Sequence, residues 1–240
     1  MKSCNVYENG DMRKVTGDTL RPGGFLLTDK AIKVCNFKQK DKILDIGCGI
    51  GETVNRLNKV YNYDSFGIDP SEKLLELGKS KYENIKISQG KGEELSFEES
   101  FFSGVFAECT MSLMDDWKKV VLEAERVLKS EGFFIISDVY ARRPEYVDEL
   151  QESNINSCMR GLLNIEKLKN FALNSGFEMV YFEECTELLK SLMVKIIFKY
   201  GSMSRFWGIA TCSTSSSCGN FQQILSLCRP GYFLMILRKK

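Results

Sequence analysis

The stretch Lys42-Ile-Leu-Asp-Ile-Gly-Cys-Gly-Ile-Gly51 decides how this chain folds. It begins as a short apolar strand, runs into three glycines, and is followed by a helical pattern from Glu52 to about Tyr61. Glycines at this point let the backbone of the turn approach a ligand closely at the carboxyl end of the strand. Glu52 replaces the last glycine of the Gly-x-Gly-x-x-Gly dinucleotide fingerprint, which weakens an NAD or FAD interpretation. A pyrophosphate at the start of the helix would also be repelled by Glu52.

A carboxylate follows the next apolar strand, which the pattern predicts over residues 65–68. At the end of that strand, Asp69 can accept hydrogen bonds from two ribose hydroxyls. The glycine turn and Asp69 together predict a site for a nucleoside that carries no pyrophosphate. The alternative interpretation is an ordinary tight turn, with Asp69 capping the helix that follows.

Apolar strands alternate with amphipathic helices along most of the chain. Further strands are predicted at 85–88, 104–108, 133–137, 177–182 and 232–237, and further helices at 71–82, 117–129, 164–175 and 188–200. Leu74, Leu75 and Leu77 are expected on the apolar side of their helix, and Thr28 is expected to cap an earlier one. The Ser/Cys-rich stretch 211–218 is predicted to be a functional or disordered loop. This alternation predicts an α/β fold with a doubly wound, mostly parallel sheet.

The absence of histidine from all 240 residues excludes several kinds of site. Ser-His-Asp and Cys-His catalysis and histidine-ligated zinc are ruled out, and no metal site is expected. The nine cysteines include no Cys-x-x-Cys pair, and the polar residues 1–14 lack the apolar core of a signal peptide. We therefore expect reduced thiols and a cytoplasmic protein.

The charge balance disfavours nucleic acid as a partner, because the chain has 33 Lys and Arg against 32 Asp and Glu. Residues 201–240 are an exception, with five basic residues and no acidic one, so a nucleic-acid partner is not excluded. No apolar run approaches the roughly 18 residues that span a membrane, and no membrane partner is expected. The oligomeric state is left open by the sequence.

Three motifs carry a resemblance to a known family. Leu44-Asp-Ile-Gly-Cys-Gly-x-Gly51, Gly67-Ile-Asp-Pro70 and Arg126-Val-Leu-Lys-Ser-Glu-Gly132 resemble the class I S-adenosylmethionine-dependent methyltransferases. Within that class the chain is most similar to the small-molecule enzymes related to ubiquinone and menaquinone methyltransferases. The resemblance implies a Rossmann-like sheet of seven strands and methyl transfer from S-adenosyl-L-methionine to a small-molecule acceptor. It divides the chain into an N-terminal flap and helix (1–40), a cofactor-binding core (41–183), and an insertion with the last strand (184–240).

The resemblance also implies which residues hold the cofactor. Asp69 would bind the ribose, and the turn from Gly90 to Glu93 would meet the adenine ring with its backbone. In that turn Lys91 stands where the family has an Asp that accepts from the adenine amine. The residues implied for cofactor binding are Asp45, Gly47, Cys48, Gly49, Asp69, Pro70, Lys91, Gly92, Glu93, Glu108 and Cys109. Of these, Asp45, Gly47 and Gly49 would line the methionine part, Pro70 would pack beside the adenine, and the backbone of the last two would receive the methionine amino group.

Methyl transfer is an in-line displacement that depends chiefly on positioning, so it does not need a histidine. Asp138, at the end of the strand 133–137, is the best-placed free carboxylate for an acceptor site, or else it caps the next loop. Cys158, in Cys158-Met-Arg-Gly161, is similar to a cysteine of arsenite methyltransferases that helps to bind trivalent arsenic. Its possible partners would be Cys109, Cys212 and Cys218; the alternative is that these are ordinary core cysteines.

Three functions are therefore open at this point. The first is a carbon, oxygen or nitrogen methyltransferase that acts on a small molecule. The second is an arsenite or thiol methyltransferase that uses cysteines. The third is a non-catalytic cofactor-binding protein that acts through its basic, Cys-rich tail.

Arg21-Pro-Gly-Gly24, with Thr28, resembles the flap that covers the cofactor in such enzymes, or it is a plain turn. Phe206, Trp207 and Tyr232 are expected either in the core or as an aromatic wall.

Overall fold

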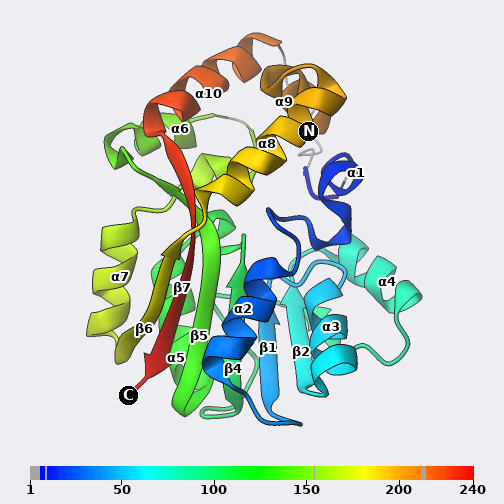
Figure 1. The fold of residues 1–240 in the computed structure, drawn as a ribbon, viewed down its shortest axis with the longest axis vertical. Coiled ribbons are helices and arrows are strands. Elements are labelled where there is room, and N and C mark those ends of the chain that lie inside the picture. Colours follow the sequence, from blue (N-terminus) through cyan, green and yellow to red (C-terminus); the bar gives the residue numbers. More distant parts are fainter. Residues whose placement is uncertain (1–5, 9, 154, 212–214) are drawn as a thin grey trace.

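A single seven-stranded sheet organises the part of the chain that the computed structural model describes, residues 6–8, 10–153, 155–211 and 215–240 (Figure 1). The described strands lie in the order β3-β2-β1-β4-β5-β7-β6, and β7 runs antiparallel to the other six. Their bounds are β1 Lys42–Ile46, β2 Asp64–Asp69, β3 Ile87–Gln89, β4 Phe102–Glu108, β5 Leu128–Ala141, β6 Phe177–Glu184 and β7 Pro230–Lys239. The prediction of a doubly wound, mostly parallel sheet is confirmed.

β1 is an interior strand of the sheet, and its residues Ile43, Leu44 and Ile46 are completely buried. It pairs with β2 on one side and with β4 on the other, so the order of the strands reverses direction at β1. In sheets of this kind a crevice opens at the carboxyl ends of the strands where the order reverses, and ligands bind there. The crevice of this protein therefore lies beyond the ends of β1 and β4.

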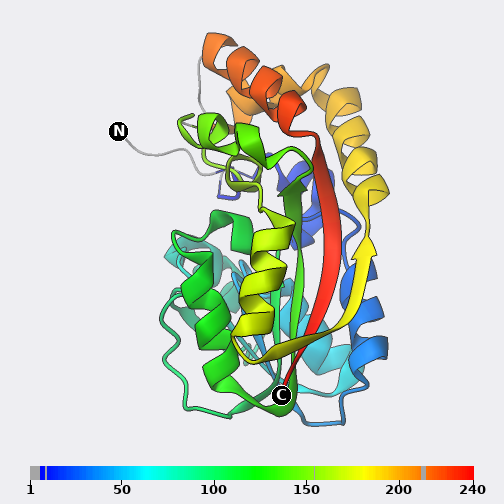
Figure 2. The same cartoon turned by 90° about the vertical axis from the view of Figure 1, so that its left-hand side faces the viewer.

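Helices cover both faces of the sheet (Figure 2). The helices α2 and α3 pack on one face through a cluster that includes Ala31 and Leu57, and α5 and α7 pack on the other through Val121 and Leu168. The bounds of the helices are α1 Arg13–Thr16, α2 Leu26–Cys35, α3 Glu52–Tyr61, α4 Glu72–Lys81, α5 Trp117–Val127, α6 Val147–Gln151, α7 Ile165–Asn174, α8 Thr186–Tyr200, α9 Met203–Thr211 and α10 Ser215–Cys228, with short 3-10 turns η1 Gly17–Thr19, η2 Met111–Leu113, η3 Pro144–Tyr146 and η4 Cys158–Gly161.

The helices α8, α9 and α10 gather beyond the carboxyl ends of the parallel strands, next to the N-terminal helix α1 (Figure 1). The loop predicted over 211–218 is wrong for residues 215–218, which begin α10; residues 212–214 lie outside the described residues. In α10, Cys218, Phe221 and Leu225 are buried at helical spacing, a signal that the surrounding serines obscured in the sequence.

Two further local predictions are wrong. Thr28 lies inside α2 and caps no helix, because α2 already begins at Leu26. Leu77 is 43% exposed, since Leu74, Leu75 and Gly78 form the side of α4 that faces the sheet. Elsewhere the predicted strands and helices are all present, with ends that differ by a few residues.

No helix in the described residues combines the length and the apolar composition needed to cross a membrane.

Two helical glycines provide a matched test of the packing between α4 and the glycine turn. A Cβ on Gly78 would collide with the backbone carbonyl of Ile50, whereas a Cβ on Gly219 would meet nothing within 4 Å. We expect Gly219→Ala to raise the free energy of unfolding by about 0.5–1 kcal/mol, because alanine is the better helix former. Gly78→Ala should instead lower it by about 1–3 kcal/mol, since α4 must move away from the turn. Urea unfolding measures both, and an equal stabilisation by the two variants would refute the close approach.

Candidate functional site

The turn between β1 and α3 is shaped by glycines with positive φ angles. Gly47, Gly49 and Gly51 have φ angles of +74°, +54° and +82°, a region that favours glycine. A Cβ on Gly47 would overlap the side chain of Thr110, so no other residue fits there. The N–H groups of Gly47 and Cys48 both donate to the carbonyl oxygen of Ile68, at 2.8 and 2.9 Å. The end of β1 is therefore bound directly to the end of β2.

Asp69 lies at the end of β2, facing this turn. Its Oδ2 accepts from the N–H of Gly49 and its Oδ1 from the N–H of Ser71, both at 2.8 Å. Burial raises the pKa of Asp69, and the two N–H donors oppose part of that rise. Ser71, rather than Asp69, is the N-cap of α4. Each carboxylate oxygen of Asp69 thus keeps accepting capacity for a further donor.

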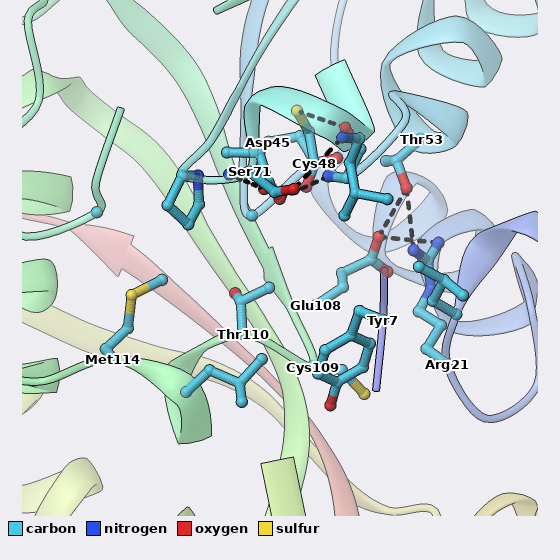
Figure 3. Close-up of a pocket in the computed structure, with 18 of the residues that line it drawn as sticks. Tyr7, Arg21, Asp45, Cys48, Thr53, Ser71, Glu108, Cys109, Thr110 and Met114 are labelled. Atoms are coloured by element: carbon cyan, nitrogen blue, oxygen red, sulfur yellow. Dashed lines mark hydrogen bonds and ion pairs between the residues drawn. The ribbon is translucent and has the colours of Figure 1, made fainter. Parts of the chain in front are cut away.

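A cavity of about 210 Å³ opens beyond the ends of β1, β2 and β4 (Figure 3). All eleven residues predicted to bind the cofactor line it: Asp45, Gly47, Cys48, Gly49, Asp69, Pro70, Lys91, Gly92, Glu93, Glu108 and Cys109. The structure therefore brings them together in one place. Glu93 also uses its side chain elsewhere, because its Oε1 accepts from the N–H of Asp115 at 2.9 Å.

The Asp45 carboxylate is buried beside the cavity and has no hydrogen-bond partner among the described residues. Burial, reinforced by the nearby carboxylates of Glu108 and Asp69, raises the pKa of Asp45 well above the usual range, and Arg21 opposes the rise. Three acidic side chains thus share this part of the cavity with one arginine. A cationic ligand group would offset that excess of negative charge.

Arg21 and Glu108 form a buried ion pair of 2.9 Å across the cavity wall, and their side chains are 7% and 2% exposed (Figure 3). Arg21 donates to the hydroxyls of Thr28 and Thr53, and both threonines in turn donate to Glu108, at 2.8 and 3.2 Å. This network ties the segment before α2 to the end of β4. Arg21 was predicted to lie in a flap or in a plain turn, and the ion pair was not predicted, because nothing in the local pattern relates residue 21 to residue 108.

Asp138 does not have the free carboxylate that we predicted. It is completely buried, does not line the cavity, and accepts from the N–H and the hydroxyl of Ser112 and from the N–H of Val139, at 2.7–2.9 Å. Burial raises the pKa of Asp138 to about 6, although these donors oppose the rise. Its contacts hold η2 at the edge of the cavity.

The predicted cysteine set does not assemble in the described residues. Cys109 and Cys158 line a second, smaller cavity, and burial raises the pKa of both thiols, that of Cys158 to about 12. Cys218 is buried in α10 and lines neither cavity, while Cys212 lies outside the described residues. In the part of the chain that the structure describes, no group of three or more cysteine and acidic side chains could hold a metal ion.

The aromatic residues divide between the two predicted places. Trp207 lines the second cavity, whereas Phe206 and Tyr232 are fully buried and line neither cavity. Tyr7 lines both cavities. The sequence analysis did not identify Tyr7, which lies in a turn-rich segment with no recognisable pattern.

Comparison with known proteins identifies one matching family model. Residues 44–136 match the methyltransferase domain family. The chain is 30% identical over 123 residues to the uncharacterized methyltransferase YcgJ of Bacillus subtilis, covering 49% of this chain and 48% of that protein. It is 32% identical over 111 residues to the demethylmenaquinone methyltransferase of Staphylococcus aureus, covering 44% and 46%. The chain thus spans about half the length of the curated relatives that it matches.

A solved structure extends the likeness of the fold to almost the whole chain. The phosphoethanolamine N-methyltransferase 2 of Haemonchus contortus, solved with S-adenosyl-L-methionine, superimposes with a TM-score of 0.75 over 97% of this chain and 57% of that one, at 19% identity. At this level of identity the likeness concerns the fold alone.

The buried ion pair can be tested by comparing single and double variants. Arg21→Met leaves Glu108 buried without its cation, and we expect it to lower the free energy of unfolding by about 3–5 kcal/mol. Replacing both residues with Met removes both charges and should be less harmful than the single change. Urea unfolding of the wild type, the two single variants and the double variant measures the coupling. If the losses of unfolding free energy in the two single variants simply add in the double variant, the two side chains are not coupled.

The raised pKa of Asp138 predicts a pH-dependent contribution to stability. The folded state holds the proton more tightly than the unfolded state, so this contribution is largest below pH 3.8 and falls as the pH rises through about 6. Asp138→Asn cannot titrate there. We expect the free energy of unfolding of the wild type, relative to the variant, to fall by on the order of 3 kcal/mol between about pH 4 and pH 6. A constant difference in urea unfolding over this range would show that the pKa is not raised.

Proposed function

This chain carries a class I methyltransferase domain, and we propose that the protein transfers a methyl group from S-adenosyl-L-methionine to a small-molecule acceptor. The observation that carries the proposal is the buried carboxylate of Asp45, which has no hydrogen-bond partner among the described residues and lies where the cofactor would present its positive charges. Bound in this cavity, S-adenosylmethionine would supply an electrophilic methyl group on a positively charged sulfur.

The chemistry of the lining fits the nucleoside half of this cofactor. Asp69 has accepting capacity left on both carboxylate oxygens and suits the two hydroxyls of a ribose. Beside it, Pro70, Leu74 and Met114 offer apolar surface for a planar base. No pyrophosphate is expected here, since Glu52 begins α3 and lines the same cavity.

The methionine half is a zwitterion, and the other end of the cavity has charges of both signs. Asp45 and Glu108 suit an ammonium group, and the Arg21 guanidinium suits a carboxylate. Gly47 has no side chain to fill the cavity at this point, so a ligand can reach the ends of β1 and β4. These assignments extend the predicted set by Arg21.

We assign the chain's own contribution to alignment and to exclusion of water. The Arg21–Glu108 pair holds the N-terminal segment against the cavity, where Tyr7 and Leu20 form part of the wall. Asp138 is a positioning residue in this proposal, because it fixes η2 and thereby the edge next to Leu113. Holding a nucleophile about 3–3.5 Å from the methyl carbon in such an enclosure supplies much of the rate enhancement.

Ligand-induced thermal stabilisation tests this proposal. At about 100 times its dissociation constant a ligand adds about 2.7 kcal/mol, so S-adenosylmethionine or S-adenosylhomocysteine should raise the Tm by roughly 5–10 °C. NAD and ATP should leave the Tm unchanged. Asp69→Ala should abolish the shift, whereas Asp64→Ala, at the opposite end of β2, should preserve it.

The proposal fails if neither sulfur nucleoside stabilises the wild type. An equal shift with ATP, or loss of the shift in Asp64→Ala as well, would show that the stabilisation does not arise from recognition of the nucleoside by Asp69.

A further inference from the structure

A second cavity adjoins the candidate cofactor site and differs from it in chemistry. It is lined by Leu189, Leu192 and Ile196 of α8, Met203 and Trp207 of α9, and Val139 near the end of β5, among others. Among the residues that the structure describes, no charged side chain lines it. Tyr7, Leu20 and Cys109 line both cavities and therefore mark the junction between them.

One polar group in this lining is unsatisfied. Ser157 is 3% exposed, and its hydroxyl has no hydrogen-bond partner among the described residues. The neighbouring polar groups are partnered: the Tyr7 hydroxyl accepts from the N–H of Cys158 at 3.0 Å, and the Cys109 thiol lies 3.2 Å from the Tyr232 hydroxyl. A buried hydroxyl without a partner costs about 1–3 kcal/mol, so a ligand group that pairs with it is favoured.

We propose that this second cavity binds the apolar end of the methyl acceptor, and that the Ser157 hydroxyl hydrogen-bonds the acceptor's single neutral polar group, a hydroxyl or a carbonyl. The inference rests on the proposed function, because the junction at Tyr7 and Cys109 is where the acceptor would meet the cofactor. The acceptor class is then neutral and mostly apolar.

Charge and size both restrict this class. A carboxylate, phosphate or ammonium group would lose its hydration in the cavity without gaining a counter-ion, at a cost of several kcal/mol. The cavity measures about 30 Å³, which is room for about two water molecules. It therefore takes only a short end of the acceptor, and the reacting atom remains at the junction.

Trp207 provides a direct reporter for this cavity. The sequence has 2 tryptophans, and the other, Trp117, packs against Phe171. In a Trp117→Phe background, the emission of Trp207 can be titrated with phenol, toluene and benzoate. The ring of each probe stays at the junction, and only its hydroxyl, methyl or carboxylate is small enough to enter the cavity. We expect phenol and toluene to bind, and benzoate to bind at least about tenfold more weakly.

Two serine variants assign the hydrogen bond. Ser157→Ala should weaken the binding of phenol by about 2- to 10-fold and leave the binding of toluene unchanged. Ser153→Ala is the matched control, because its hydroxyl is also buried without a partner among the described residues but does not line the cavity. Ser153→Ala should change the affinity for neither phenol nor toluene. Benzoate binding as tightly as phenol, or equal effects of Ser157→Ala on phenol and toluene, would overturn the proposal.

The titrations are made without cofactor, so their result is independent of the thermal-shift experiment. If S-adenosylmethionine binds and the probe pattern is absent, the assignment of the second cavity falls and the proposed function stands. If the probe pattern is present and no sulfur nucleoside binds, the cavity remains an apolar binding site but its role as an acceptor site is overturned.

Discussion

The turn from Gly47 to Gly51 is held from two sides, and the position of the candidate site depends on it. The carbonyl of Ile68 accepts two of its N–H groups, and the carboxylate of Asp69 accepts a third. On the other side Thr110 leaves Gly47 no room for a side chain. Three strand ends thereby converge on one cavity. The interactions that close the turn also orient Asp69 toward that cavity, so the contacts that fix the fold also position the carboxylate proposed to bind the ribose.

Polarity separates the two cavities. Acidic groups exceed the single buried arginine in the first, where Asp45 has no hydrogen-bond partner. In the second, no charged side chain takes part in the lining; both statements concern the described residues. Carboxylates in such surroundings favour the protonated form until a cation approaches them. Affinity for a cationic ligand should therefore be coupled to the protonation of Asp45, whose pKa is raised by burial. A charged molecule and a neutral one would each have a suitable place, with Tyr7 and Cys109 between them.

Local signals account for what the sequence predicted well. The strand Lys42–Ile46 and the helix Glu52–Tyr61 have the predicted bounds, because an apolar run and a glycine turn mark them. The eleven residues around the first cavity could be predicted because they lie in short motifs at strand ends. The prediction failed where the determining contact is remote in sequence. Arg21 pairs with Glu108, and Asp138 is buried against Ser112. Both contacts depend on the positions of β4 and β5 in the sheet. The serines of α10 hid a helix whose buried positions are few.

The place of β7 in the sheet has a consequence for the assembly of the molecule. Residues 230–239 lie between β5 and β6, and among the described strands β6 pairs with β7 alone. Until this segment leaves the ribosome, β6 has no strand to join and β5 presents an open edge. Such an edge can pair with another chain. A polypeptide that contains the entire glycine turn but lacks β7 therefore has an incomplete sheet, and insertion of β7 between β5 and β6 closes that edge.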